Sequence, residues 1–238
     1  MEHQAKRGYL PSDAKEFGES SLHVLRRAAE EVYYLINRGY PITNVTRFVG
    51  NHYLLSERQR LALARSISPE ERIISRKARE VKDIAGRTIY IDGFNLIIGL
   101  EIAFSGSILF RCMDGTVRDL AGLRGTYRLI PETDAAVEAL MTSLEELQVE
   151  KAVIYLDKPV SNSGRLKQKI LSYAADAHFD TEVVIEDAVD HELKQKELVA
   201  TGDAIILDEC DQWFNLAGYV ISRRIGEYPY IELFVEKE

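Results

Sequence analysis

The sequence has few of the residues that mark disulfide-linked, secreted or membrane proteins. Only two cysteines, Cys112 and Cys210, occur among its 238 residues. Neither belongs to a CxxC or CxxH pair, which leaves no basis for a zinc site or a disulfide framework. No run of 18 or more apolar residues is present, and the polar start MEHQAKRGYLPSDAKEF lacks the apolar core of a signal peptide. We therefore expect a cytoplasmic protein that does not associate with membranes.

Several common catalytic motifs are also missing. The chain contains no GxSxG nucleophile elbow, no GxGxxG after the first predicted strand and no GxxxxGK[ST] loop. These absences argue against a serine hydrolase, a dinucleotide-dependent enzyme and a P-loop nucleotidase.

The charge is unevenly distributed along the chain. Residues 1–80 carry 14 Lys and Arg against 10 Asp and Glu, whereas residues 81–238 carry 16 against 28. An acidic balance disfavours nonspecific binding of polyanions by the larger piece. Such binding is possible if the carboxylates of this piece surround metal ions, because the ions reverse the local electrostatic field.

The first third of the chain has the pattern of helices. Apolar residues recur three and four positions apart in SSLHVLRRAAEEVYYLINRGY, and Ser56 and Gln59 have the spacing of a capping box. We predict four short helices and a small all-helical domain over residues 1–83. We interpret this domain as an RNA-binding or interaction module.

The period changes after Ile84. TIYID, KAVIYLD, TEVVIED and ELVATGD are short β-branched runs separated by helical patterns. Alternating strands and helices predict an α/β domain over residues 84–238, with an open parallel sheet of four to five core strands flanked by helices. SILFRCMDGTVRDL predicts a hairpin turning at Asp114 and Gly115. GYVISRR and YIELFVE predict two further strands.

Each of the four runs ends in an acidic residue. Active sites of open parallel sheets form at the carboxyl ends of the strands, and carboxylates gathered there repel each other unless a cation lies among them. Oxygen ligands favour Mg²⁺ or Mn²⁺. The candidate ligands are Asp92, Asp157, Asp190, Asp203 and Asp208. The alternative is that each acid only caps the following helix.

Two residues next to Asp92 fit the same hypothesis. Gly93 would let the backbone turn sharply and leave room for a metal ion and its substrate. Asn95 would either orient the Asp92 carboxylate or cap the helix that follows.

The motif IYIDGFNLI resembles the first strand of the PIN-like nucleases, in particular their NYN branch, and LVATGDAIILD resembles their later motif of Thr or Ser, one variable residue and Asp. This resemblance covers residues 86–222 and implies a PIN-like fold and a Mg²⁺- or Mn²⁺-dependent ribonuclease. It also implies that Asp92, Asp190 and Asp203 are ligands. It leaves the last ligand open among Asp208, Glu209 and Asp211. The whole chain also resembles a two-domain family of archaea and bacteria.

Two segments are candidates for binding the RNA. Hydroxyl groups, backbone amides and cations converge at the predicted helix start in SNSGRLKQK, an arrangement suited to phosphate; the candidates are Ser161, Asn162, Ser163, Arg165 and Lys167. Arg118, Arg124 and Arg128 with Tyr127 form a second candidate, for single-stranded RNA. The alternatives are an ordinary solvated helix start and scattered ion pairs.

The sequence thus predicts a metal-dependent ribonuclease with Asp92, Asp190, Asp203 and Asn95 as catalytic residues, single-stranded RNA as partner and possible homo-oligomers. Two other classes stay open. One is a noncatalytic RNA- or nucleotide-binding module with a degenerate acidic pocket. The other is a structural protein in which the acids only cap helices.

Overall fold

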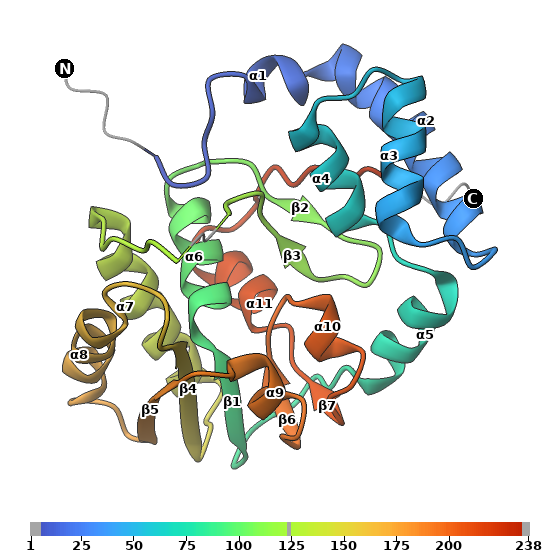
Figure 1. Ribbon diagram of the computed structural model, residues 1–238. Helices are drawn as coiled ribbons and strands as arrows, with labels where there is room; N and C mark the ends of the chain where they lie inside the picture. The colour runs from blue at the N-terminus through green and yellow to red at the C-terminus, as the bar shows by residue number, and fades with distance from the viewer. Residues whose placement is uncertain (1–5, 123–124, 235–238) are drawn as a thin grey trace. The chain divides into compact units, whose positions relative to one another are not determined.

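The computed structural model describes residues 6–122 and 125–234, and the chain divides into two compact units. The first unit, called the helical unit below, consists of the chain up to Lys77, the segment Ser107–Ala121 and the chain from Pro229 onward. The second, the α/β unit, consists of Ala78–Gly106 and Gly122–Tyr228. The course of the chain can be followed by colour in Figure 1.

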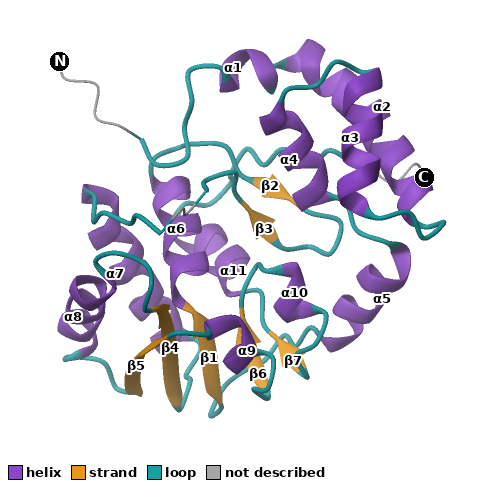
Figure 2. Cartoon of the chain, in the orientation of Figure 1, coloured by secondary structure: helices purple, strands orange, loops and turns teal. Residues whose placement is uncertain are grey.

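The α/β unit is built on one five-stranded sheet (Figure 2). Its strands are β1 (Thr88–Asp92), β4 (Lys151–Asp157), β5 (Asp180–Glu186), β6 (Leu198–Ala200) and β7 (Gln212–Trp213). They pair in the order β5-β4-β1-β6-β7, and every neighbouring pair is parallel. The predicted parallel sheet and its four strands are confirmed. Strands β1, β4 and β5 end in Asp92, Asp157 and Glu186, whereas β6 ends at Ala200, three residues before Asp203. The short strand β7 was not predicted.

Both faces of the sheet are covered, which explains why its strands are nearly continuous apolar runs. Side chains alternate between the faces. Val153 and Tyr155 pack in a cluster with Val199 and Trp213 on one face. Ile154, between them in β4, is also fully buried.

Two groups of helices surround the sheet. Helices α6 (Gly93–Phe104), α7 (Pro131–Glu146), α8 (Ser163–Ala174) and α11 (Leu216–Arg224) contact one another in a chain of neighbours. The short helices α9 (Val189–Leu193) and α10 (Ala204–Leu207) contact each other, and their apolar residues belong to the cluster of Tyr155 and Trp213.

The strand order reverses at β1. Strands β4 and β5 lie on one side of β1, and β6 and β7 lie on the other. The carboxyl ends of β1 and β6 therefore flank the point where open parallel sheets form their binding crevice.

The helical unit contains α1 (Asp13–Glu16), α2 (Glu19–Ile36), α3 (Ile42–His52), α4 (Glu57–Ser66) and most of α5 (Glu70–Arg79). The four predicted helices are α2 to α5, whereas α1 was not predicted. Ser56 and Gln59 form the predicted capping box at the start of α4: the Ser56 hydroxyl accepts from the Gln59 amide, and the Gln59 side chain accepts from the Ser56 amide.

The predicted hairpin is confirmed, with β2 (Phe110–Arg111), β3 (Val117–Arg118) and a positive φ at Gly115 in the turn. It packs in the helical unit, where Phe110, Cys112 and Leu120 join the core of α2, α3 and α4. Residue Ile231 pairs with Phe110, and Leu233 enters the same core. The predicted boundary after residue 83 places the hairpin and the C-terminal segment in the α/β domain, whereas both belong to the helical unit.

The two strands predicted in the tail are wrong. Residues Gly218–Arg224 lie in helix α11, and of YIELFVE only Ile231 makes an isolated bridge among the described residues. Two local features favour the helix. The Asn215 side chain caps its start by accepting from the Gly218 amide, and Leu216, Val220 and Ile221 recur at helical spacing and are buried.

Gly93 is required by packing against a neighbouring strand. A Cβ atom at this position would lie 2.7 Å from the Tyr155 carbonyl oxygen and 2.7 Å from Leu156 Cδ2. The glycine thus allows helix α6 to start directly against β4, and the predicted need for room around a metal ion is not the observed reason.

We expect Gly93→Ala to destabilise the protein by about 1–3 kcal/mol, because the new methyl group collides with strand backbone that has no space to retreat. Urea unfolding measures this change. Gly99→Ala is the matched control, since Gly99 lies in the same helix with nothing within 4 Å of its missing Cβ. It should be neutral or stabilising, as alanine favours a helix interior. Equal effects of the two substitutions would contradict the packing argument.

Candidate acidic site at the carboxyl edge of the sheet

Asp92 is the buried member of the site. It is the last residue of β1 and the N-cap of α6, and its side chain is only 7% exposed. Its Oδ1 accepts a hydrogen bond from the Asn95 amide at 3.3 Å, and its Oδ2 accepts from the Thr201 hydroxyl at 2.8 Å. The Asp92 carboxyl group therefore caps helix α6 and also contacts the segment that follows β6.

The second strand of the crevice supplies Asp203. It is the N-cap of α10, and its Oδ1 accepts from the Ile205 amide at 2.7 Å. Its own amide donates to the Thr201 hydroxyl oxygen at 3.0 Å, and that hydroxyl donates to Asp92. Thr201 thus links the two acidic residues, although it was not among the predicted site residues. The Thr-Gly-Asp spacing in TGD was the signal for it.

Asn95 makes a second link between the same segments. Its side-chain oxygen accepts from the Gly202 amide at 2.7 Å, while its own amide caps toward Asp92. The side chain of Asn95 was predicted to orient the Asp92 carboxylate or to cap the helix. It instead positions the loop before Asp203, and the backbone amide of Asn95 donates to the Asp92 carboxylate.

The electrostatics of Asp157 and Asp190 tie them to the same site. Burial raises the pKa of Asp157, and the negative charge of Asp190 raises it further. Burial also raises the pKa of Asp190, with a further increase from Asp203 and a decrease from Lys194. Asp157 ends β4 and Asp190 begins α9. Carboxylates that raise one another's pKa lie close enough to repel.

The same repulsion reaches Asp92. Burial raises its pKa to about 7, against the hydrogen bonds from Thr201 and Asn95, and the charges of Asp203 and Asp157 add to the increase. Four carboxylates from four segments therefore form one electrostatic group, called the acidic site below: Asp92, Asp157, Asp190 and Asp203.

No ion pair within the described residues neutralises this group. None of the four carboxylates forms an ion pair with a lysine, arginine or histidine within residues 6–122 and 125–234. Lys194, whose charge lowers the pKa of Asp190, forms its ion pair with Glu209, and Lys158 forms one with Asp187. In the same part of the chain, no three His, Cys, Asp or Glu side chains stand at the mutual distances of a metal site.

Asp208 does not belong to this electrostatic group. It directly follows the last residue of α10, and its backbone carbonyl accepts a hydrogen bond from Arg79 at 3.5 Å. Its negative charge contributes to the raised pKa of the Cys210 thiol. None of the pKa shifts of the acidic site involves it.

Two side chains of the predicted phosphate loop form hydrogen bonds within the protein. The Ser161 hydroxyl accepts from the Tyr127 amide and donates to the Tyr127 carbonyl, and Asn162 Nδ2 donates to the same carbonyl at 2.7 Å. Ser163 is buried, whereas Arg165 is exposed and Lys167 is half-buried. The side chains of Ser161 and Asn162 thus hold the backbone of Tyr127, and Ser161 and Arg165 are exposed to solvent.

The second predicted RNA segment is not a continuous surface. Tyr127 is fully buried, and Arg118 is bound to the buried Asp114 in the helical unit. Arg124 lies outside the described residues. These two side chains therefore do not present the stacking face that the interleaved pattern suggested.

Tyr127 has a buried carboxylate as its partner. Its hydroxyl donates to Glu101 at 2.6 Å, and the Thr133 hydroxyl donates to the same Oε1 at 2.5 Å. Glu101 is the one acid within the apolar helix NLIIGLEIAF, a signal of a buried polar contact that the sequence reasoning passed over.

None of the helices within the described residues has both the length and the apolar character needed to cross a membrane.

The fold and the acidic site define a two-unit protein with an α/β unit that carries carboxylates at one sheet edge. Residues 81–219 match the family described as Domain of unknown function (DUF5616), and residues 24–79 match Protein of unknown function (DUF434). The chain belongs to this two-domain family. The Uncharacterized protein MJ0935 of Methanocaldococcus jannaschii is 40% identical over 185 residues, which are 77% of this chain and 88% of the relative. No solved structure matches the chain.

Proposed function

We propose that the protein is a metal-dependent ribonuclease of the PIN-like class whose active site is the acidic site. The observation that carries this proposal is a group of four electrostatically coupled carboxylates at the switch point of a parallel sheet, none of which forms an ion pair among the described residues. Protein groups with strongly shifted pKa values at such a position are candidates for function.

The chemistry of the donor set suits a hard divalent cation, and within the described residues the carboxylates would have to move closer together to share one. All four groups are carboxylates, which Mg²⁺ and Mn²⁺ prefer, and a cation among them would relieve the repulsion that raises their pKa values. Asp92, Asp157, Asp190 and Asp203 would hold it. When bound, such an ion activates water and stabilises the leaving oxygen of a phosphodiester.

The residues around the ligands position them. Thr201 and Asn95 fix the Asp92 carboxylate and the loop before Asp203 through four hydrogen bonds. The two motifs that resemble PIN-like nucleases thus meet in direct contact, which supports the resemblance. Arg165 and Lys167 at the start of α8 are the cations available to bind the RNA backbone.

A binding module is the second candidate. It is the noncatalytic alternative that the sequence leaves open, a pocket that holds an RNA end or nucleotide without cutting it. This candidate and the ribonuclease share the acidic site and differ in turnover.

We expect the wild-type protein to cleave single-stranded RNA in Mn²⁺, and Asp92→Asn and Asp203→Asn to lose about a hundredfold or more of that activity. The reason is that a bound metal ion stabilises the charge of the transition state by several kcal/mol, and each 1.36 kcal/mol changes the rate tenfold. Denaturing gels of a labelled oligonucleotide measure the cleavage.

Asp187→Asn is the matched control, because Asp187 also follows a strand end but is exposed and paired with Lys158. It should cleave like the wild type. RNA binding without cleavage by the wild type would select the binding module, and equal cleavage by all variants would reject the acidic site.

A further inference from the structure

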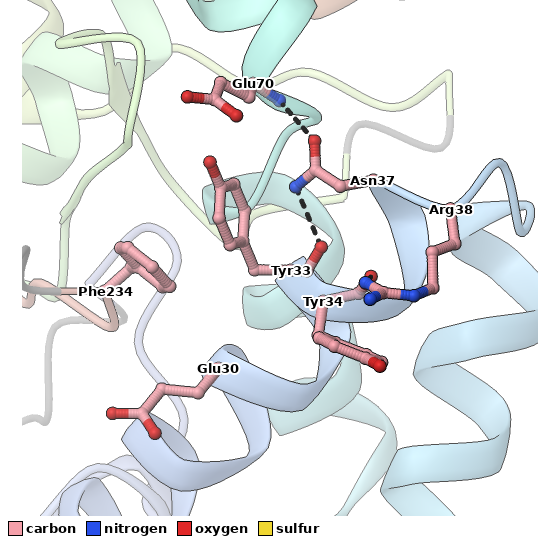
Figure 3. A pocket seen from close by; sticks show the side chains of 7 residues that line it. All are labelled: Glu30, Tyr33, Tyr34, Asn37, Arg38, Glu70 and Phe234. Carbon is pink, nitrogen blue, oxygen red and sulfur yellow. Dashed lines mark hydrogen bonds between the residues drawn. The ribbon is translucent and has the colours of Figure 1, made fainter.

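The helical unit carries a surface pocket that is independent of the acidic site. It is lined by side chains from the C-terminal half of α2, by Glu70 at the start of α5 and by Phe234 (Figure 3). Its volume is about 420 Å³, which is in the range of small-molecule sites.

Aromatic rings form much of its wall. The rings of Tyr33 and Phe234 lie 4.7 Å apart in a tilted pair, and Tyr34 is 56% exposed. The Arg38 guanidinium lies 3.4 Å from the centre of the Tyr34 ring. One tyrosine of the pocket thus already binds a cation through its face, as electron-rich rings do.

Carboxylates stand beside these rings. Glu30 and Glu70 line the pocket, and in Figure 3 the Glu70 carboxyl group lies above the hydroxyl end of Tyr33. Two adjoining hollows share residues with the pocket and add Glu31 on one side and Glu71 on the other. The three hollows share lining residues and are together called the groove below, and both carboxylates and apolar side chains line it.

The local charge opposes an RNA ligand. Four glutamates line the three hollows, against Arg38 and Arg72, although the N-terminal third of the chain has a net positive charge. A polyanion would meet repulsion here, whereas a ligand with several positive charges is attracted.

The pocket is preorganised by Asn37. Its Oδ1 accepts from the Glu70 amide at 2.9 Å, and its Nδ2 donates to the Tyr33 carbonyl at 2.9 Å. The side chain thereby fixes the start of α5 against the end of α2, so that Glu70 and Tyr33 keep their relative positions without a ligand.

We propose that this groove binds a linear aliphatic polyamine. Its ammonium groups suit the carboxylates of Glu70 and Glu71 and the half-buried ring of Phe234, and its methylene segments suit the apolar side chains that line the groove. This inference does not depend on the ribonuclease proposal.

Spermidine titrated into the full chain by calorimetry tests the proposal. We expect saturable binding that Glu70→Gln and Phe234→Leu each weaken about three- to fivefold, the factor that one exposed cation–π or ionic contact supplies. Glu19→Gln, at the other end of α2 and outside the pocket, should bind as the wild type does.

Two further measurements make the result decisive. Asp92→Asn should leave the affinity unchanged; if it weakens binding while Glu70→Gln does not, the polyamine binds at the acidic site and the proposal is wrong. N-acetyl-lysine amide should bind much more weakly than spermidine. Equal binding of the two compounds would show that the groove recognises a single lysine-like ammonium group, as on a protein partner, and the polyamine proposal would be wrong. Absence of spermidine binding would reject the site.

Discussion

Asp92→Asn is expected to unfold at a higher temperature than the wild type at pH 8 in EDTA, and at nearly the same temperature near pH 4. Asp92 is 7% exposed, and burial followed by its acidic neighbours raises its pKa to about 7. The wild type must therefore carry a buried, repelled charge at pH 8, and the asparagine variant does not.

The sign follows from proton binding. The unfolded chain releases the Asp92 proton near its ordinary pKa of 3.8, whereas the folded chain keeps it until about pH 7. Between these values the unfolded state binds fewer protons, so stability falls as pH rises, at up to about 1.4 kcal/mol per pH unit. The substitution removes this loss, and its benefit grows from pH 4 to pH 7.

Thermal unfolding at several pH values measures the effect, at about 2–4 °C for each kcal/mol in a chain of this size. Asp187→Asn, exposed and paired with Lys158, is the control and should show no such pH-dependent gain. Mn²⁺ should stabilise the wild type more than Asp92→Asn, because a ligand that binds only the folded state raises its stability. A variant that is less stable than the wild type at pH 8 would show that Asp92 acts mainly as a cap.

The sequence was informative where structure is decided locally. Short, nearly continuous β-branched runs predicted four strands, since both faces of a parallel sheet are buried. The acids at their ends predicted a common edge, because parallel strands carry their carboxyl ends to the same side. The Ser56 capping box is likewise a contact of residues three apart.

Contacts between distant segments could not be predicted from local sequence patterns. The hairpin joins the helical unit because Phe110 and Cys112 pack with residues from α2 to α4, which no local pattern reveals. Ser161 and Asn162 have a phosphate-binding composition, yet their partner is the backbone of Tyr127, 34 and 35 residues away. In GYVISRR, β-branched residues indicated a strand, but burial of Val220 and Ile221 on one side of α11 overrode that preference.

Asp114→Asn is expected to cause the largest loss of stability, about 3–5 kcal/mol, although the two side chains have nearly the same shape. Asp114 is fully buried in the helical unit, and its Oδ2 accepts from Arg76 at 2.7 Å and from Arg118 at 2.6 Å. Its Oδ1 accepts from the Thr116 amide and hydroxyl. The neutral variant leaves two buried guanidinium groups without their shared anion.

The pH dependence of this effect is opposite to that of Asp92. Burial alone would raise the pKa of Asp114, but Arg118, Thr116 and Arg76 outweigh it and lower the pKa to about 2. The contribution of Asp114 is therefore complete above the ordinary carboxyl pKa near 3.8 and is lost as pH falls toward 2. The stability difference between wild type and variant should narrow over that interval, as measured by urea unfolding.

Two comparisons identify the uncompensated charges as the cause. Asp134→Asn breaks an exposed pair with Lys169 and should cost less than about 1 kcal/mol, because water screens that pair. Adding Arg76→Met and Arg118→Met to Asp114→Asn should recover part of the lost stability, since removing buried charges that lack an anion is favourable. A triple variant less stable than Asp114→Asn alone would show that the arginines stabilise the hairpin by packing and by other hydrogen bonds, such as that from Arg76 to Ser68.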